Sequence, residues 1–496
     1  MQPVTQAVLR SWSIPPAATF AIVLSALVYL RGWWLLRRAG SPNIPPWRAV
    51  TFLLGLLALW VALASPMDVF NAFELTAHML QHMMLMMVAP PLILLGAPLV
   101  PMLRGLPIFA AREFAGPLLN WSVAKRIGSV LTNPVFALVL MGVVMFAWHT
   151  PALYELALRS PAWHQTEHAC FLIASLIFWW PVVQPWPSRA RWPRWAMVPY
   201  LLIADLQNTV LSAILVFSDR VLYPSYSAVP RLFRFSALED QVAAGSIMWV
   251  VGSLAFIVPA IVIAVQCLSK RSALEAADPS RRRETSSFDA LLSRLPGFTS
   301  SQHSANTRWR GERMEAFSFV ILFAAVALGF AALLAAGSSD DDDQVLSFQE
   351  ASGPFAVAVF APPDSFAARS SAFSVLVQDR NTHEVLLDAT VDLTALPPAG
   401  TQAAPISARA SNADSPNKLL QTADLDLPTE GDWMLNMTVQ HNADSAHFAM
   451  PLHVAKPEPG TEYPVHYIVI AMLSVILFGM YFGRRRSSQV ERPAQA

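Results

Sequence analysis

Residues 77–98 read AHMLQHMMLMMVAPPLILLGAP, an apolar run that carries two histidines four residues apart. A helix needs about 20 predominantly apolar residues to cross the hydrocarbon core of a bilayer, and this run is long enough. Side chains four residues apart lie on one face of a helix, so His78 and His82 project in the same direction from one end of the run. The run therefore predicts a transmembrane helix with a polar site near its end.

Similar apolar runs occur along the chain and together predict a polytopic membrane protein. Hydrophobic residues make up 54% of the 496 residues and charged residues only 14%, which excludes an ordinary soluble enzyme. The expected spans are 17–36, 49–65, 77–98, 133–149, 167–183, 197–217, 241–267, 315–336 and 464–482. The first seven form one membrane domain, residues 1–269.

Basic residues between the spans predict the orientation, because Lys and Arg concentrate in cytoplasmic loops. Arg37 and Arg38 follow the first span, and Arg281, Arg282 and Arg283 follow the seventh. Alternation from these loops places the N-terminus outside the cell and the C-terminus in the cytoplasm. The formal net charge is zero, so no nucleic-acid partner is indicated.

Residues 338–463 differ in character, because apolar and polar side chains alternate in segments such as FAVAVF (355–360) and WMLNMTV (433–439). Period-two alternation between turn residues predicts strands of an inserted antiparallel β-sandwich on the outer side. Residues 270–314 are rich in Ser and Arg, which predicts a flexible cytoplasmic linker. The expected fold is an all-α polytopic membrane protein with a seven-helix core, two further transmembrane helices and an exterior β-sandwich domain. The two further helices are expected at 315–336 and within 464–496, which ends in a basic cytoplasmic tail.

Five of the eleven histidines are expected at one depth, at the outer ends of three helices. They are His78 and His82 on the third span, His149 at the end of the fourth, and His164 and His168 at the start of the fifth. A lone histidine at such a depth more often packs or anchors at the interface. Two pairs with four-residue spacing can instead present imidazoles to one ion, which favours a metal or haem site.

The segment HQTEH, residues 164–168, has the H-x-x-E-H order of inverted zinc proteases, in which the glutamate acts on a metal-bound water. A protease also needs a third protein ligand, an open coordination position and a path for peptide substrate. Since this segment opens a membrane helix, we interpret Glu167 as a residue that orients or tunes the two histidines. We predict that the chain is not an enzyme, and a membrane metalloprotease is the least favoured alternative.

Methionines and acidic residues supply further candidate ligands. Met79 and Met86 border the histidine face of the third span, and thioethers beside imidazoles favour Cu(I), although packing is the commoner role of methionine. Glu239 and Asp240 begin the seventh span. They either bind metal, orient imidazoles or cap the helix, because Ser236 with Glu239 forms a capping box.

Four segments, in this order, resemble the CtaG-type cytochrome c oxidase assembly factors, which are seven-helix membrane proteins. They are AHMLQHMMLMMVAPPLILLGAP (77–98), WHTPALYELAL (148–158), HQTEHACFLIASLIFWWPV (164–182) and LYPSYSAVPRLFRFSALEDQVAAGSIMWVVG (222–252). The resemblance covers about residues 17–267 and implies a factor in the bacterial plasma membrane that helps deliver copper to an oxidase. Oxidase subunits and a periplasmic copper donor are the partners it implies, besides the lipid bilayer. By matching motif it implies a role for His78, His82, His149, His164, Glu167, His168, Glu239 and Asp240.

The β-domain resembles the small periplasmic modules of the FixH and YtkA types, through GPFAVAVF (353–360) and GDWMLNMTV (431–439). Two functions of other classes stay open. A copper transporter needs polar groups along its path, and only Asp205 and Asn208 stand out in the inner half. A membrane haem protein needs histidines on facing helices, which His78 or His82 with His168 would supply.

Overall fold

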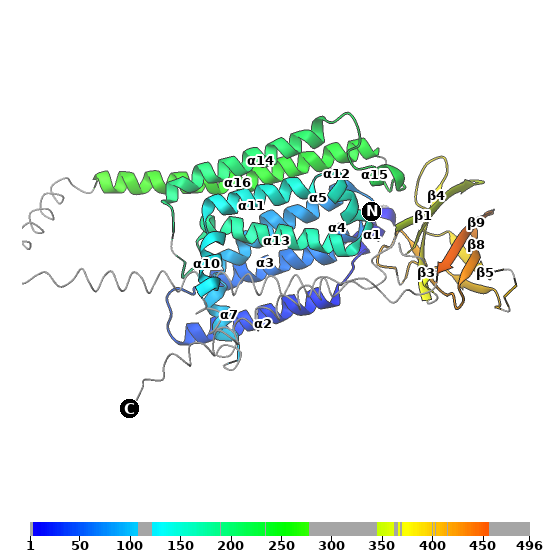
Figure 1. Ribbon diagram of the computed structural model, residues 1–496, viewed down its shortest axis with the longest axis horizontal. Coiled ribbons are helices and arrows are strands. Elements are labelled where there is room, and N and C mark those ends of the chain that lie inside the picture. The colour runs from blue at the N-terminus through cyan, green and yellow to red at the C-terminus, as the bar shows by residue number, and fades with distance from the viewer. Residues whose placement is uncertain are drawn as a thin grey trace, which may run out of the picture.

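The computed structural model describes residues 3–107, 122–276 and 345–455, apart from short gaps at 189, 234, 362–365, 368–369, 399, 402 and 414. The expected helices at 315–336 and 464–482, most of the linker 270–314 and the basic tail lie outside the described residues. What is described forms a helical part and a β part, and Figure 1 shows the β part at one end of the helices.

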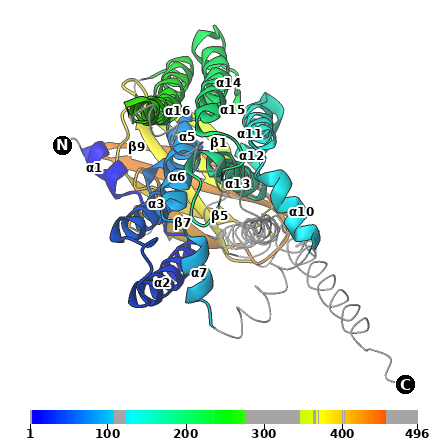
Figure 2. The same cartoon turned by 90° about the vertical axis from the view of Figure 1, so that its left-hand side faces the viewer.

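The helical part is a bundle of long helices that run side by side (Figures 1 and 2). Many helices begin with proline, whose fixed φ and missing N–H suit the first turn. The elements are α1 Pro3–Arg10, α2 Pro16–Arg38, α3 Pro46–Ala64, α4 Pro66–Val69, α5 Leu75–Met83, the π-helix η1 Met84–Val88, α6 Ala89–Leu95, α7 Leu99–Gly105, α10 Ser122–Leu131, α11 Pro134–Trp148, α12 Pro151–Arg159, α13 Pro161–Val183, the 3-10 helix η3 Arg194–Ala196, α14 Met197–Phe217, α15 Ser225–Ala228 and α16 Ala237–Ala276.

Six described helical stretches are long and apolar enough to cross a membrane, and each overlaps an expected span. They are Pro16–Arg38, Pro46–Val69, Leu75–Leu95, Pro161–Val183, Arg194–Phe217 and Ala237–Ser269. The remaining expected span of the core, 133–149, corresponds to α11, whose 15 residues rise only about 22 Å. A seventh span results only if α11 and α12 are taken as one span that is bent by 69° at their junction.

The third span changes from α-helix to π-helix at Met84–Val88, inside the methionine-rich run. Pro90 has no backbone N–H, so it cannot donate the α-helical hydrogen bond to the Met86 carbonyl. The indole of Trp179 donates to that carbonyl instead, at 3.0 Å. Trp179 lies on α13, so this bond links α13 to the third span one helical turn after His82.

The β part consists of two sheets. Their strands are β1 Val345–Ser352, β2 Phe355–Ala361, β3 Phe366–Ala367, β4 Ser370–Asp379, β5 Thr390–Leu396, β6 Ile406–Arg409, β7 Gln421–Asp426, β8 Gly431–His441 and β9 Asp444–Ala455. One sheet has the order β1-β2-β4-β7 and the other β3-β9-β8-β5-β6. All pairings are antiparallel except that of β3 with β9, which is parallel. Inward side chains of both sheets, Trp433 and Val375 among them, share one core, as expected for a sandwich.

Strand β2 is buried on both faces. In an antiparallel sheet with one face toward solvent, every second side chain would instead be exposed. One face joins the sandwich core, and the other, with Ala358 and Phe360, packs against Phe73 and Leu232 of the helical part. The rings of Phe73 and Phe360 lie 5.0 Å apart. The four-stranded sheet therefore docks on the end of the bundle.

Two polar contacts accompany this docking. Gln378 Nε2 donates to the Arg231 carbonyl at 2.9 Å, and the Lys418 N–H donates to Ser11 Oγ at 3.0 Å. The N-terminal helix α1 and the β part lie at the same end of the bundle (Figure 1). Both were expected on the same side of the membrane, and which side it is stays a prediction.

Candidate metal centre

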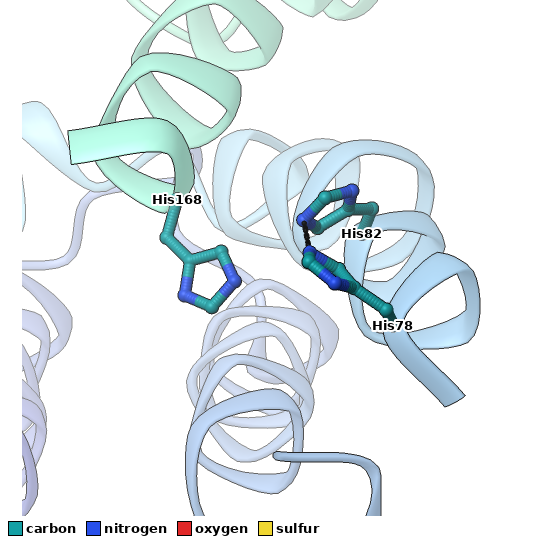
Figure 3. A group of neighbouring side chains, drawn as sticks. All are labelled: His78, His82 and His168. Atoms are coloured by element: carbon teal, nitrogen blue, oxygen red, sulfur yellow. Dashed lines mark hydrogen bonds between the residues drawn. The ribbon is translucent and has the colours of Figure 1, made fainter. Parts of the chain in front are cut away.

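A cluster of histidines and one glutamate forms where α5 meets α13. Two groups of potential ligands have donor atoms within 4.8 Å of one another, His78 with His82 and His168, and His78 with His164 and Glu167. The four-residue spacing within each helix places the two α5 rings together and turns His164 and His168 toward them. Figure 3 shows the ring of His168 facing the pair from the neighbouring helix. Five of the residues expected at the site are thus brought together.

The Glu167 carboxylate faces the two imidazoles of α5. His78 Nε2 and His82 Nε2 lie 2.9 Å apart, and they lie 3.7 and 3.8 Å from Glu167 Oε2 and Oε1. All three side chains are at most 1% exposed. Burial of a carboxylate among imidazoles is costly without a compensating positive charge or hydrogen bond.

Several nitrogen and oxygen atoms of the cluster that could bind a metal have no hydrogen-bond partner among the described residues. They are both carboxylate oxygens of Glu167, Nδ1 of His82 and the Nε2 atoms of His149, His164 and His168. Buried polar atoms are nearly always paired, so a group of unpaired ones requires an explanation. A bound metal ion would satisfy these atoms, since imidazole nitrogen and carboxylate oxygen are both metal ligands.

His149 lies beside the cluster at the bend between α11 and α12. Its ring centre is 6.5 Å from that of His82. Its Nδ1 atom is 2.7 Å from the Met145 carbonyl oxygen, which can only accept, so Nδ1 carries the hydrogen and Nε2 is left with a free lone pair. His149 is therefore prepared to act as a ligand through Nε2, although it is not within either close group.

Three tyrosines cover the cluster on the side of the loop between α14 and α16. Tyr226 OH lies 3.1 Å from His78 Nδ1 and donates to the Asn71 carbonyl at 2.8 Å. Tyr154 OH lies 3.2 Å from Tyr226 OH, and Tyr223 OH donates to the His149 carbonyl at 3.0 Å. Burial raises the pKa of Tyr226 well above its ordinary value, so the phenol stays neutral.

Asp240 acts at the beginning of α5, although it belongs to α16. Its two carboxylate oxygens accept the backbone N–H groups of Leu75 and Thr76, at 2.7 and 3.1 Å. The first N–H groups of a helix have no partner within the helix, and a carboxylate there is favourable. Asp240 therefore positions the helix that carries His78 and His82.

Arg231 links this helix start to the surrounding loops. Its guanidinium bonds to Glu74, lies 3.4 Å from Asp240, and donates to the Tyr226 carbonyl at 3.3 Å. Two carboxylates thus share one guanidinium. Burial raises the pKa of Glu74 to about 8, while Arg231 acts in the opposite direction and the Asp240 charge adds to the rise.

Three further site residues were expected, namely Glu239, Met79 and Met86. Glu239 is exposed and bonds to the N–H and hydroxyl of Ser236, which is the capping arrangement that the sequence left open. Met79 and Met86 are buried, at 0% and 1% exposure, and their role as ligands stays a prediction. Tyr226 and Arg231 both lie in the segment 222–252, but no local sequence pattern distinguishes them, because their partners are distant in sequence.

The helical part of the chain is similar to a known family. Residues 27–270 match the model of the cytochrome c oxidase caa3 assembly factor family, Caa3_CtaG. This match confirms the resemblance drawn from the four segments, and it includes every histidine of the cluster.

Three curated relatives, from mycobacteria, are themselves described only as uncharacterized proteins. Those of Mycobacterium bovis and Mycobacterium tuberculosis are 27% identical over 279 residues, which is 53% of this chain and 40% of each relative. That of Mycobacterium leprae is 27% identical over 250 residues, or 50% of this chain and 38% of the relative. The chain thus spans about 40% of the length of these relatives. No solved structure matches it.

Proposed function

We propose that this chain, whose residues 27–270 match the caa3 assembly factors, helps to mature a haem–copper cytochrome c oxidase by binding copper and passing it to an oxidase subunit. The family match supports the assembly role. The copper role rests on one observation, the convergence of four imidazoles and a carboxylate with unpaired donor atoms. Copper is the cargo in this proposal, and no catalytic step is assigned to the chain.

The ligand types support copper as the cargo. Imidazole binds Cu, Zn, Fe and Ni, and a thioether from Met79 or Met86, both buried on the same span as His78 and His82, would favour Cu(I). The cluster is also crowded, because the rings of His78 and His82 are centred 4.3 Å apart and those of His164 and His168 4.2 Å apart. This crowding supports a small ion over the porphyrin plane of the haem alternative.

The position of the cluster supports transfer to a partner. His78 and His82 belong to the first two turns of α5, at the end of the bundle where the β part docks. On the expected orientation this end faces the periplasm, where a copper donor and the exposed parts of an oxidase subunit are accessible. A location in the bacterial plasma membrane is supported by the apolar helices and by the family match.

A copper transporter is the second candidate, because α14 carries polar atoms without described partners inside a span. They are Asp205 Oδ1, Asn208 Oδ1 and Ser212 Oγ. A polar path through a span is what a transporter requires and a chaperone does not. Uptake of radioactive copper into vesicles that contain the purified chain, with an Asn208→Leu variant as comparison, separates the two candidates.

The decisive experiment is anaerobic purification of the full chain with metal analysis and an optical spectrum, together with oxidase assays in a host that lacks the gene. We expect retention of Cu(I), no Soret band, and loss of copper-loaded oxidase in the host. A Soret band would favour the haem protein, and bound zinc with peptide cleavage would favour the protease. Normal oxidase without this chain would contradict the proposed function.

A further inference from the structure

The hydroxyl of Tyr226 contacts the candidate ligand His78 on the side of the ring that faces away from the metal position. Tyr226 OH lies 3.1 Å from Nδ1 of His78, whereas Nε2 of the same ring faces His82 and Glu167. The tyrosine is 1% exposed, so no water competes freely for this contact. Its hydroxyl is therefore a neighbour of the site and not one of its ligand atoms.

Counting hydrogens gives the state of the His78 ring. A phenol has one hydrogen, and the Asn71 carbonyl, at 2.8 Å from Tyr226 OH, can only accept it. The hydroxyl must then accept at its other contacts, so Tyr154 donates to it and so does His78 Nδ1. The hydrogen of neutral His78 thus lies on Nδ1, and Nε2 presents a lone pair to the cluster.

We propose that Tyr226, anchored on the Asn71 carbonyl, is a positioning residue of the metal centre that holds His78 in the Nδ1–H tautomer with Nε2 as its ligand atom. Hydrogen bonds of this kind commonly select the tautomer and ring orientation of metal-binding histidines. The inference rests on the proposed function for the identity of the metal, but the tautomer follows from the contacts alone.

The surrounding contacts hold Tyr226 in place. Ser225 donates its N–H to Glu155 Oε1 at 3.0 Å and its hydroxyl to Oε2 at 2.5 Å. Arg231 donates to the carbonyl of Tyr226 from the other direction. Because the tyrosine is held by its backbone neighbours, the imidazole must adopt the tautomer that the hydroxyl accepts.

His149 offers an internal comparison, since a backbone carbonyl performs the same task there. The Met145 carbonyl accepts from His149 Nδ1 and leaves Nε2 free. Both histidines are therefore set to bind through Nε2. For His149 the partner is a main-chain carbonyl, which a substitution cannot remove, and for His78 it is the side chain of Tyr226. Only the latter is open to substitution.

The test uses Tyr226→Phe, with Tyr200→Phe as the matched control. Tyr200 is also buried, stacks on Phe178 with ring centres 4.9 Å apart, and donates to the Phe178 carbonyl at 2.8 Å, ten residues along α13 from His168. Loss of an outer hydrogen bond typically weakens metal binding about 10–100-fold. We expect that loss for Tyr226→Phe in Cu(I) competition titrations of the full chain, and wild-type affinity for Tyr200→Phe.

X-ray absorption of the copper-loaded chain supplies a readout that packing alone would not change. We expect one imidazole fewer around copper in Tyr226→Phe and an unchanged number in Tyr200→Phe. Equal losses of affinity in both variants, or an unchanged imidazole number in Tyr226→Phe, would overturn the proposal.

A metal-free measurement separates this inference from the proposed function. In the full chain labelled with ¹⁵N-histidine, the chemical shifts distinguish Nδ1–H from Nε2–H, and a His78→Ala variant identifies the signal. We expect Nδ1–H in the wild type and a mixture in Tyr226→Phe. Nε2–H in the wild type would overturn the inference even if copper binds, whereas failure of the chain to bind copper would overturn only the proposed function.

Discussion

The end of the helical bundle and the β part both carry several histidines, but these histidines differ in burial and in their neighbours. In the bundle, His78, His82 and His168 are buried and their rings converge from two helices. In the β part, His453 is 72% exposed and lies 2.6 Å from Asp432 on the adjacent strand, and His447 pairs with Thr438. His447 and His453 are thus exposed residues, each with its own neighbour.

The difference shows why residue type alone does not define a metal site. A β-sheet sends alternate side chains to opposite faces, so histidines at positions 447 and 453 share a face but lie far apart along β9. Paired histidines on two facing helices converge because both helices repeat nearly every four residues. Convergence and burial distinguish the bundle cluster, and they can be tested against the β part.

The largest effect is expected from removing ligands. A change of His78 and His82 together to Ala should abolish retention of Cu(I), because even outer-shell changes cost about 10–100-fold in affinity. The matched change of His447 and His453 to Ala should leave retention unchanged. Metal analysis after anaerobic purification measures both, and equal losses would remove the distinction between the two regions.

A smaller loss is expected from the acidic partner of each region. Glu167→Gln keeps the shape of the side chain but removes its charge, and we expect Cu(I) affinity to fall about tenfold, within the range for altered metal surroundings. Asp432→Asn, beside exposed His453, should have no effect. Competition titration with a Cu(I) chelator compares them, and wild-type affinity in Glu167→Gln would show that the carboxylate does not contact the metal.

The independence of the two cores gives the next prediction. Trp433 is 1% exposed in the sandwich, and Trp433→Ala should destabilise the β part by about 3–5 kcal/mol. Copper retention should not change, since distant cores act independently. Limited proteolysis followed by metal analysis measures both, and loss of copper would show that the docked β part sustains the metal centre.

The last prediction concerns the pH dependence of stability. Folding raises the pKa of Glu74 from 4.5 to about 8 through burial, so the folded chain keeps a proton that the unfolded chain releases. This group therefore lowers the free energy of unfolding as pH rises from 4.5 to about 8, and Glu74→Gln should lack that slope.

The β part supplies the opposite case. The hydrogen bond from Arg409 lowers the pKa of exposed Asp392, so its contribution is present above the ordinary pKa and is lost as pH falls. Thermal unfolding in detergent across this pH range compares Glu74→Gln with Asp392→Asn. An identical pH slope in wild type and Glu74→Gln would contradict the assignment for Glu74.

The sequence by itself determined the features that depend on neighbouring residues. Apolar length located the six helical stretches that are long enough to cross a membrane, and the four-residue spacing grouped the histidines of α5 and α13 on single faces. Period-two alternation indicated the sandwich. These patterns are local, because helix and strand periods are properties of a short run of chain.

Only the tertiary structure decided how distant residues act on one another. Asp240 holds the start of a helix 165 positions earlier in the chain, and Tyr226 contacts a histidine 148 positions away. The parallel strand β3 and the doubly buried strand β2 are further examples, since both depend on what packs beside them. Periodicity records which way a side chain points, whereas its partner is set by the packing of whole elements.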